Sequence, residues 1–218
     1  MWWWLGLGGL ATAKLLIDVF NDPPATPQKK LSILETNLSR LRLELHSENS
    51  RRIAILGQPG AGKSSLLKRM TQGKVRPLPV IGVETDATNW SDSTDCHVLS
   101  RYDEYTFIDV PGYDTIQHPL HTMRMHFPFS DMDVYILVIR DKLRNADQEI
   151  FRAISRSGKP VCVVRSFAET LDSNERNQVK RDLQNRFELD KGINIEFFSS
   201  RTKEGISRIF GFVKKHVG

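Results

Sequence analysis

The sequence predicts a three-layer α/β domain, in which helices cover both faces of a mostly parallel six-stranded sheet, preceded by an amphipathic helix. Two observations lead to this prediction: short apolar runs alternate with segments of helical periodicity, and a glycine-rich loop follows the first apolar run. Strands that alternate with helices are typical of parallel sheets covered on both faces. The 218 residues are 39% hydrophobic and 26% charged, which indicates one folded domain with an appendage and excludes a disordered or fibrous protein.

The chain divides by composition into an N-terminal segment, a linker and a long folded part. Residues 1–20 are apolar, with no charged side chain before Lys14. Residues 21–30 contain three prolines, which cannot continue a helix, and are interpreted as a linker. An amphipathic helix is expected over residues 31–48, and the α/β domain over residues 51–218. The helix is predicted from leucines at steps of three and four residues: Leu31, Leu34, Leu38, Leu41 and Leu45.

Within the α/β domain, strands and helices are assigned from the apolar pattern. The predicted strands are residues 53–56, 96–99, 105–110, 133–139, 160–164 and 193–198. The predicted helices are residues 63–70, 115–126, 146–156, 174–187 and 204–216.

Residues 1–20 leave three interpretations open. Tryptophan favours the bilayer interface, and three tryptophans follow Met1, which favours an anchor that associates with or inserts into a membrane. A helix packed on the folded domain or on a partner is the second, because Lys14 and Asp18 interrupt the apolar run. A cleaved signal peptide is the third, although no basic region precedes the apolar residues. The expected location is cytoplasmic with membrane association, and only two cysteines fit a reducing compartment.

The glycine-rich loop has the sequence GQPGAGKS over residues 57–64, between a predicted buried strand and a predicted helix. This pattern and context are typical of a loop that cradles nucleotide phosphates, with backbone N–H groups at a helix N-terminus. Lys63 is expected to reach the β- and γ-phosphates, and the Ser64 hydroxyl to bind Mg²⁺. The residues expected to touch the phosphates are Gly57, Gln58, Pro59, Gly60, Ala61, Gly62, Lys63, Ser64 and Ser65.

A second motif, DVPG, begins at Asp109, at the end of a predicted strand, where open α/β sheets bind their ligands. Asp109 is expected to hold Mg²⁺ through water, and the Gly112 N–H to contact a γ-phosphate. Residues 82–88, between the two motifs, contain a threonine expected to close over Mg²⁺: Thr85, with Thr88 as the alternative. The expected catalytic residues are Lys63, Thr85 and Gly112, and the expected metal ligands are Ser64, Thr85 and Asp109.

The order of these motifs resembles the Ras-like P-loop GTPase superfamily, and within it the Era-like and immunity-related GTPases. The resemblance extends from residue 52 to residue 218 and includes the helix expected before the domain. It implies a Ras-like G domain that uses GTP or GDP and Mg²⁺ and acts as a nucleotide-dependent switch or assembly GTPase. It also implies nucleotide-dependent self-association or a protein effector as partners.

One motif departs from the resemblance. Guanine-reading GTPases carry Asn/Thr-Lys-x-Asp, and here Ser166 takes the place of Asn/Thr, Phe167 of Lys and Glu169 of Asp. Glutamate keeps the carboxylate on a longer stem and Phe167 can cover the base by stacking, so a weakened guanine preference is expected. The residues expected at the base are Arg165, Ser166 and Glu169, with Ser199 and Ser200 from a later loop.

Tyr113 and Pro59 predict slow hydrolysis. Tyr113 follows the DVPG glycine, where many GTPases of this kind carry the glutamine that orients water, and Pro59 fills a position that is usually small. Turnover well below a typical enzyme rate of ~10 s⁻¹ is therefore expected. Two alternatives remain: a pseudo-GTPase interaction module, and a P-loop NTPase with relaxed base specificity. Nucleic acid is not an expected partner, because the net charge of +5 is modest and no basic run reaches five residues.

Overall fold

The computed structural model describes residues 30–47, 49–79, 81, 89–187 and 193–217. The chain divides into two units, Met1–Leu31 and Ser32–Gly218, and the elements below all belong to the second. The segment predicted to be an anchor and residues 21–29 of the predicted linker lie outside the described residues, as do Thr85 and its alternative Thr88. Among the helices that are described, none is long and apolar enough to cross a membrane.

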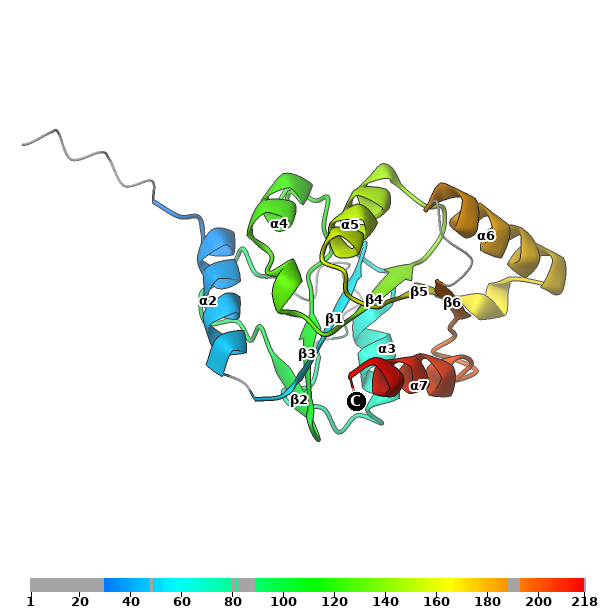
Figure 1. Cartoon of the computed structure of the whole chain (residues 1–218), viewed down its shortest axis with the longest axis horizontal. Helices are drawn as coiled ribbons and strands as arrows, with labels where there is room; N and C mark the ends of the chain where they lie inside the picture. The colour runs from blue at the N-terminus through cyan, green and yellow to red at the C-terminus, as the bar shows by residue number, and fades with distance from the viewer. Residues whose placement is uncertain (1–29, 48, 80, 82–88, 188–192, 218) are drawn as a thin grey trace, which may run out of the picture. The chain divides into compact units, whose positions relative to one another are not determined.

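The sheet has six strands in the order β2-β3-β1-β4-β5-β6 (Figure 1). Only β2 runs antiparallel to its neighbour, so the predicted mostly parallel sheet is confirmed. The inner strands β1, β3 and β4 are buried along nearly their whole length, apart from Arg51 and Arg52 at the start of β1, and most of their residues are apolar, as expected for a sheet covered on both faces. The strand bounds are Arg51–Gly57 for β1, Ser100–Tyr102 for β2, Tyr105–Asp109 for β3, Val134–Ile139 for β4, Val161–Arg165 for β5 and Asn194–Phe197 for β6.

Helices form a layer on each face of the sheet. Successive residues of a strand point to opposite faces, so a strand of apolar residues has two apolar faces to cover. Ile53 and Ile55 of β1 pack in the apolar core under α3 and α7, whereas Ala54 and Leu56 pack in the core under the other helices. Figure 1 shows α4, α5 and α6 across the sheet from α3 and α7. The helix bounds are Ile33–Ser47 for α2, Lys63–Met70 for α3, Leu120–His126 for α4, Asn145–Arg156 for α5, Ser173–Arg186 for α6 and Ile206–Val217 for α7. Short 3₁₀ turns occupy Phe129–Asp131 and Ala168–Thr170.

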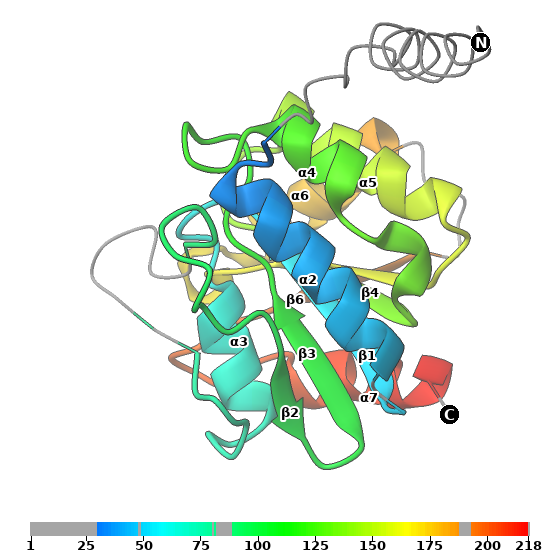
Figure 2. The ribbon, with the colours of Figure 1, turned by 90° about the vertical axis from the view of Figure 1, so that its left-hand side faces the viewer.

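The amphipathic helix predicted before the domain is α2, and it packs beside α4 (Figure 2). Four of its leucines, Leu34, Leu38, Leu41 and Leu45, belong to the core, which confirms the predicted apolar face. The helix is shorter than predicted, because Ser32 and Glu35 form a capping box that begins it. The Glu35 N–H donates to the Ser32 hydroxyl at 3.2 Å, and the Ser32 N–H to a Glu35 carboxylate oxygen at 2.8 Å. Leu31 therefore lies before the helix and is 49% exposed.

Most predicted elements agree with the structure to within two residues, and two differ by more. Residues 96–99 are not a strand: the Arg40 guanidinium of α2 donates to the Cys96 carbonyl, and β2 begins only at Ser100. The helix predicted over residues 115–126 begins only at Leu120. Pro119 precedes it and disfavours the helical conformation for the residue before it.

Candidate nucleotide site

The loop between β1 and α3 is shaped by its glycines. Gly57 and Gly62 have φ angles of 154° and 95°, a region that side chains with a Cβ rarely adopt. A Cβ on Gly57 would lie 2.4 Å from the Val138 carbonyl oxygen in the neighbouring strand. The loop therefore turns tightly between strand and helix, and it leads into the N-terminus of α3, the end of a helix that favours an anion.

Lys63 lies inside this loop and is only 8% exposed. Its ammonium donates to the backbone carbonyl oxygens of Gly57 at 3.0 Å and of Gln58 at 3.1 Å. Ser65 follows in the first turn of α3 and is half-buried. The structure thus brings the predicted phosphate-contacting residues together around a buried positive charge.

Asp109 completes this end of the site. It lies at the end of β3, paired in register with Ile55 of β1, and so beside the glycine-rich loop. The Ser64 hydroxyl donates to its Oδ2 at 2.6 Å, while its buried Oδ1 has no hydrogen-bond partner among the described residues. Burial raises the pKa of Asp109 above its usual range, and Lys63 and Ser64 partly offset that rise. A hydroxyl beside an unsatisfied carboxylate oxygen is a donor set that Mg²⁺ prefers.

The DVPG motif touches the glycine-rich loop directly. A Cβ on Gly112 would lie 2.5 Å from the Pro59 ring, so glycine is required where the two segments meet. This contact places the Gly112 backbone beside the phosphate loop, as its predicted role requires.

A second cluster collects the residues predicted to contact a base. Ser166 follows β5, and its Cβ lies 3.9 Å from where a Cβ on Gly62 would be, so β5 ends against the phosphate loop. Glu169 lies in the 3₁₀ turn that follows, with one carboxylate oxygen 3.8 Å from the Arg201 guanidinium. Its other oxygen, Oε2, is buried and has no hydrogen-bond partner in the described part of the chain. A hydrogen bond from the Ser199 side chain, aided by Arg201, lowers the pKa of Glu169 below its usual range.

The remaining predicted residues at this end have different surroundings. The Ser199 hydroxyl is fully buried and also accepts hydrogen bonds from the backbone N–H groups of Arg201 and Thr202, at 3.2 and 3.1 Å. Ser200 is half-buried beside it. Arg165 is buried, its guanidinium donates to the Ser166 carbonyl oxygen, and burial lowers its pKa. Arg165 thus supports the end of β5 from within the fold.

Comparison with known proteins agrees with this geometry. The model of a family described as 50S ribosome-binding GTPases matches residues 52–166, just over half of the chain. The chain belongs to this GTPase family. GTPase Der of Streptococcus agalactiae serotype III is 28% identical over 199 residues, covering 84% of this chain and 44% of that protein. GTPase Der of Streptococcus thermophilus strain LMD-9 is 26% identical over the same length. The chain spans less than half the length of these curated relatives.

Solved GTPase structures share the fold. Era of Aquifex aeolicus, in a variant bound to GDP and aluminium fluoride, superposes with a TM-score of 0.58 at 20% identity, covering 77% of this chain and 56% of that one. A GTP-binding protein named engB gives a TM-score of 0.55 at 16% identity, covering 76% of this chain and 98% of that one. These matches confirm the Ras-like G-domain fold.

Tyr113 of this GTPase faces the protein interior. It is fully buried, and its hydroxyl donates to Asp147 Oδ1, in the first turn of α5, at 2.6 Å. The Gln58 side-chain amide donates to the same oxygen at 3.4 Å, which links the phosphate loop to this pair. Burial raises the pKa of Asp147, and the hydrogen bond from Tyr113 is the largest influence that opposes the rise.

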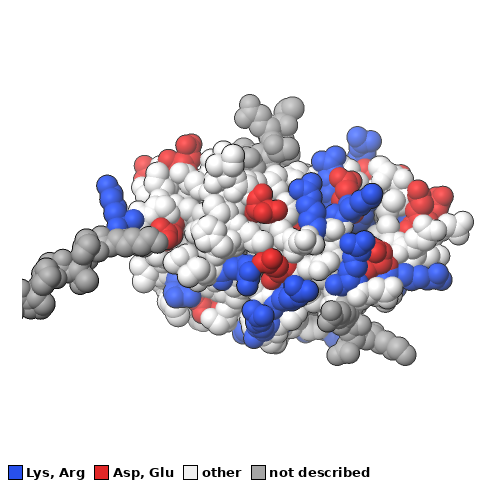
Figure 3. Space-filling model, turned by 90° about the horizontal axis from the view of Figure 1, so that it is seen from above, with Lys and Arg blue, Asp and Glu red and all other residues white. Residues whose placement is uncertain are grey.

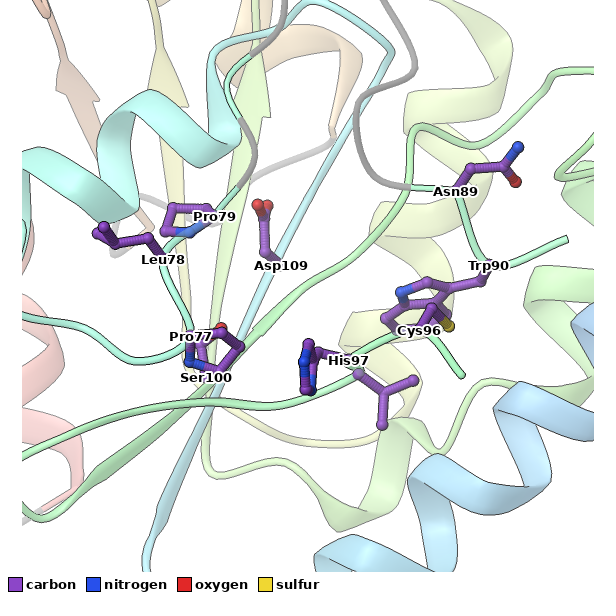
Figure 4. A pocket seen from close by; sticks show the side chains of 10 residues that line it. Pro77, Leu78, Pro79, Asn89, Trp90, Cys96, His97, Ser100 and Asp109 are labelled. Carbon is purple, nitrogen blue, oxygen red and sulfur yellow. The ribbon is translucent and has the colours of Figure 1, made fainter. Parts of the chain in front are cut away.

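A cavity of about 240 Å³ lies beside Asp109 (Figure 4). Its opposite wall includes Trp90 and Cys96, from the chain that follows residues 82–88, and the Trp90 indole nitrogen points toward the cavity in this view. Pro77 and Leu78, which precede residues 82–88 in the chain, also line the cavity. The cavity therefore borders both the predicted magnesium position and the ends of the segment that carries Thr85.

Three residues of this region were not identified as functional from the sequence. Asn37 of α2 is fully buried, and its amide donates to the carbonyl oxygens of Trp90 at 2.7 Å and Ser93 at 2.9 Å. His118 Nε2 accepts the Trp90 N–H at 3.1 Å. Asp147, the partner of Tyr113, is the third. Each contact joins residues 28 or more positions apart, so no local pattern announces it.

Proposed function

We propose that this GTPase binds GTP and GDP with Mg²⁺, hydrolyses GTP slowly, and acts as a nucleotide-dependent switch or assembly GTPase. The main observation is the buried cluster of Lys63, Ser64 and Asp109, which holds a positive charge, a hydroxyl and an unsatisfied carboxylate oxygen at the mouth of the glycine-rich loop. Such a cluster suits a triphosphate and a divalent cation together.

In the proposed mechanism, the Lys63 ammonium exchanges its two backbone carbonyl partners for phosphate oxygens. Ser64 and Asp109, with Thr85 from outside the described residues, would hold Mg²⁺, which supplies positive charge to the phosphates. The Gly112 N–H would contact the γ-phosphate, and its position against Pro59 favours that role. Loss of the γ-phosphate would then release the segments around Thr85 and Gly112.

The base is proposed to be guanine. Guanine presents two adjacent N–H donors, and a carboxylate accepts both, whereas the corresponding edge of adenine carries an acceptor that a carboxylate repels. The buried Glu169 Oε2 is an acceptor whose bond is unmade among the residues described. The lowered pKa keeps Glu169 ionised at neutral pH, as this contact requires.

Slow hydrolysis is supported by the surroundings of Tyr113. The side chain that follows the DVPG glycine is fully buried and hydrogen-bonded to Asp147, so it does not reach a water molecule beside a γ-phosphate. Faster turnover would then require a partner that supplies the missing group.

The test is the binding of fluorescent GTP and ATP analogues, each with Mg²⁺, to the full chain and to Lys63→Ala. Removing two charge-assisted hydrogen bonds is expected to weaken GTP binding by about 100-fold or more. Lys68→Ala is the matched control, because Lys68 is exposed on the same helix. Equal GTP and ATP affinity would favour an NTPase of relaxed base specificity, and no binding of either would favour the pseudo-GTPase module.

Two further parts of the proposal concern location and partners. A cytoplasmic protein that associates with membranes through residues 1–20 is supported by the tryptophans at positions 2–4. Sedimentation with anionic lipid vesicles should fall when Trp2, Trp3 and Trp4 are all replaced by serine, and unchanged sedimentation would contradict the proposal. Self-association or an effector in the GTP state is also proposed. Self-association is tested by analytical ultracentrifugation with GDP and with a non-hydrolysable GTP analogue, and equal sedimentation coefficients would contradict it.

The proposed partners do not include nucleic acid. Acidic side chains are interspersed among the basic ones on the face in Figure 3. Ion pairs such as Arg124 with Glu149 and Arg186 with Asp182 neutralise charge locally. Strong binding to nucleic acid requires basic residues that track the phosphates without such neutralisation.

A further inference from the structure

The helix α2 supplies hydrogen bonds to an irregular stretch of the chain, residues 89–99. This stretch forms neither a helix nor a strand, so its backbone polar groups need partners from elsewhere in the fold. The fully buried Asn37 of α2 provides one such partner, because its amide donates to the carbonyl oxygens of Trp90 at 2.7 Å and Ser93 at 2.9 Å. A single side chain of α2 thus holds the first part of the stretch.

A second side chain of α2 holds the next part. The Arg40 guanidinium donates to the carbonyl oxygens of Thr94 and Cys96. Arg40 and Asn37 are three positions apart, so the two side chains lie on the same face of the helix. The guanidinium is a rigid planar group with several donors, and two carbonyl oxygens that bind it are fixed relative to each other. The position of residues 89–99 therefore depends on α2.

This stretch of chain is a wall of the nucleotide site. Trp90 and Cys96 line the cavity that also touches Asp109, the predicted magnesium residue (Figure 4). The stretch directly follows residues 82–88, in which Thr85 is the expected metal ligand. Where α2 holds its carbonyl oxygens, it also determines where the chain from Thr85 continues past the site.

The same stretch is joined to the chain that follows the DVPG motif. The Trp90 N–H donates to Nε2 of the fully buried His118 at 3.1 Å, and the Ser91 hydroxyl donates to the Gln117 carbonyl oxygen. Both partners lie shortly after Gly112, the glycine proposed to contact the γ-phosphate. Trp90 is thus bound through its carbonyl oxygen to α2 and through its N–H to the DVPG side, so one residue connects the helix with both segments.

We propose that α2 positions the two segments that meet the γ-phosphate, and that Asn37 is the positioning residue through which it acts. The helix precedes residues 52–166, which the GTPase family model matches, so this support is added to the matched part of the domain. The inference rests on the proposed function, because it assumes GTP and Mg²⁺ in the site. GDP lacks the γ-phosphate, so its affinity does not depend on these two segments, whereas the affinity for GTP does.

The experiment measures the affinity of the full chain for GDP and for a non-hydrolysable GTP analogue, each with Mg²⁺, by competition against a fluorescent GDP analogue. Asn37→Leu keeps the size of the side chain but removes the donor to both carbonyl oxygens. The affinity for the GTP analogue is expected to fall about tenfold, and the affinity for GDP to stay within about twofold. The ratio of the two affinities is the decisive quantity, because general damage to the fold would lower both.

Arg40→Gln repeats the test without changing the core. The Arg40 side chain is 31% exposed, so its replacement leaves the packing of the apolar residues intact. The ratio of GTP-analogue to GDP affinity is expected to fall about fivefold. Arg42→Gln is the matched control, because Arg42 lies on the same helix but pairs with Asp131 instead of the stretch.

Leu45→Ala separates positioning from a structural role of α2. Leu45 is fully buried in the core at the other end of the helix, and its side chain forms no hydrogen bonds. The variant should lower Tm at least as much as Asn37→Leu does, yet leave the ratio of affinities unchanged. An equal loss of GTP-analogue and GDP affinity in Asn37→Leu and Arg40→Gln, or a fall in the ratio in Leu45→Ala as large as theirs, would overturn the inference while leaving the proposed function in place. No GTP binding by the unaltered chain would overturn both.

Discussion

The phosphate end and the base end of the site are built in different ways. The phosphate end is one short loop, residues 57–64, whose backbone shape is set by glycines, with Asp109 added from the adjacent strand. The base end is assembled from side chains that follow two different strands: Ser166 and Glu169 after β5, and Ser199 after β6. The loop at the phosphate end tolerates few substitutions, because its backbone shape requires glycine. The side chains at the base end can be exchanged while the fold is kept.

Glu169→Gln should have the largest effect at the base end. The amide presents a donor as well as an acceptor, so it loses the charge that strengthens both hydrogen bonds to guanine. The amide donor faces one of the two guanine N–H groups, so about one charge-assisted hydrogen bond of about 1.5–3 kcal/mol is lost, and GTP affinity should fall about 10- to 100-fold while ATP affinity changes little. Competition binding measures both values. Asp182→Asn, an exposed acid on α6, is the control, and an equal loss for ATP would show that Glu169 does not select the base.

Asp109→Asn tests the phosphate end. Mg²⁺ should then increase the affinity for nucleotide about tenfold less, or less still, than it does in the unaltered chain, because a carboxylate is the ligand this cation prefers.

The same variant should change the pH dependence of stability. Burial raises the pKa of Asp109, so the ionised carboxylate is disfavoured in the folded state, and the nucleotide-free protein gains stability as pH falls through that raised pKa. The variant should lose this contribution to the pH dependence and have a higher Tm at neutral pH without nucleotide. A lower Tm would contradict this account.

The residues expected at the phosphate end lie together in the structure, and the sequence could indicate this because they are nearly contiguous. A glycine-rich loop between a buried strand and a helix leaves few alternatives, and the register of β1 with β3 places Asp109 beside it. The leucines of α2 were predictable for the same reason, since their spacing is local. Periodicity failed at residues 96–99. Val98 and Leu99 are buried as the pattern indicated, but the burial comes from packing in the core that includes α2 rather than from a place in the sheet.

The base end was only partly predictable because its contacts are long-range. The positions of Ser166, Phe167 and Glu169 could be inferred from one motif. Nothing local, however, indicates that the guanidinium of Arg140, 27 residues earlier in the chain, lies 4.6 Å from the centre of the Phe167 ring. Tyr113 shows the same limit. Its place after DVPG suggested slow hydrolysis, whereas its contact with Asp147 depends on how α5 packs against the sheet.

Tyr113→Phe tests whether that tyrosine has a structural role. Without the hydroxyl, the buried Asp147 Oδ1 loses the hydrogen bond from Tyr113. The free energy of unfolding, measured by urea denaturation, should therefore fall by about 1–3 kcal/mol. The loss should shrink as pH falls, because the Asp147 carboxyl then becomes protonated and no longer requires the lost donor. The single-turnover rate of GTP hydrolysis should stay within about twofold.

Tyr135→Phe is the control for this change. Tyr135 is also buried, but its hydroxyl donates to the Phe129 carbonyl oxygen at 2.6 Å, which does not titrate. Its destabilisation should therefore be similar in size but independent of pH. A large fall in the hydrolysis rate of Tyr113→Phe would assign that hydroxyl to catalysis instead.

Ser199→Ala should have the smallest effect, and it sharpens the comparison between the two ends. The hydrogen bond from Ser199 is the main cause of the lowered pKa of Glu169, so removing it should raise that pKa toward its usual value. As pH falls, Glu169 of the variant would be protonated sooner, and GTP affinity should decline at a higher pH than in the unaltered chain. Titration of the phosphates is common to both proteins, so the difference between the two pH profiles isolates Glu169. Ser200→Ala should leave the profile unchanged, and coincident profiles for Ser199→Ala would mean that guanine recognition does not depend on the charge of Glu169.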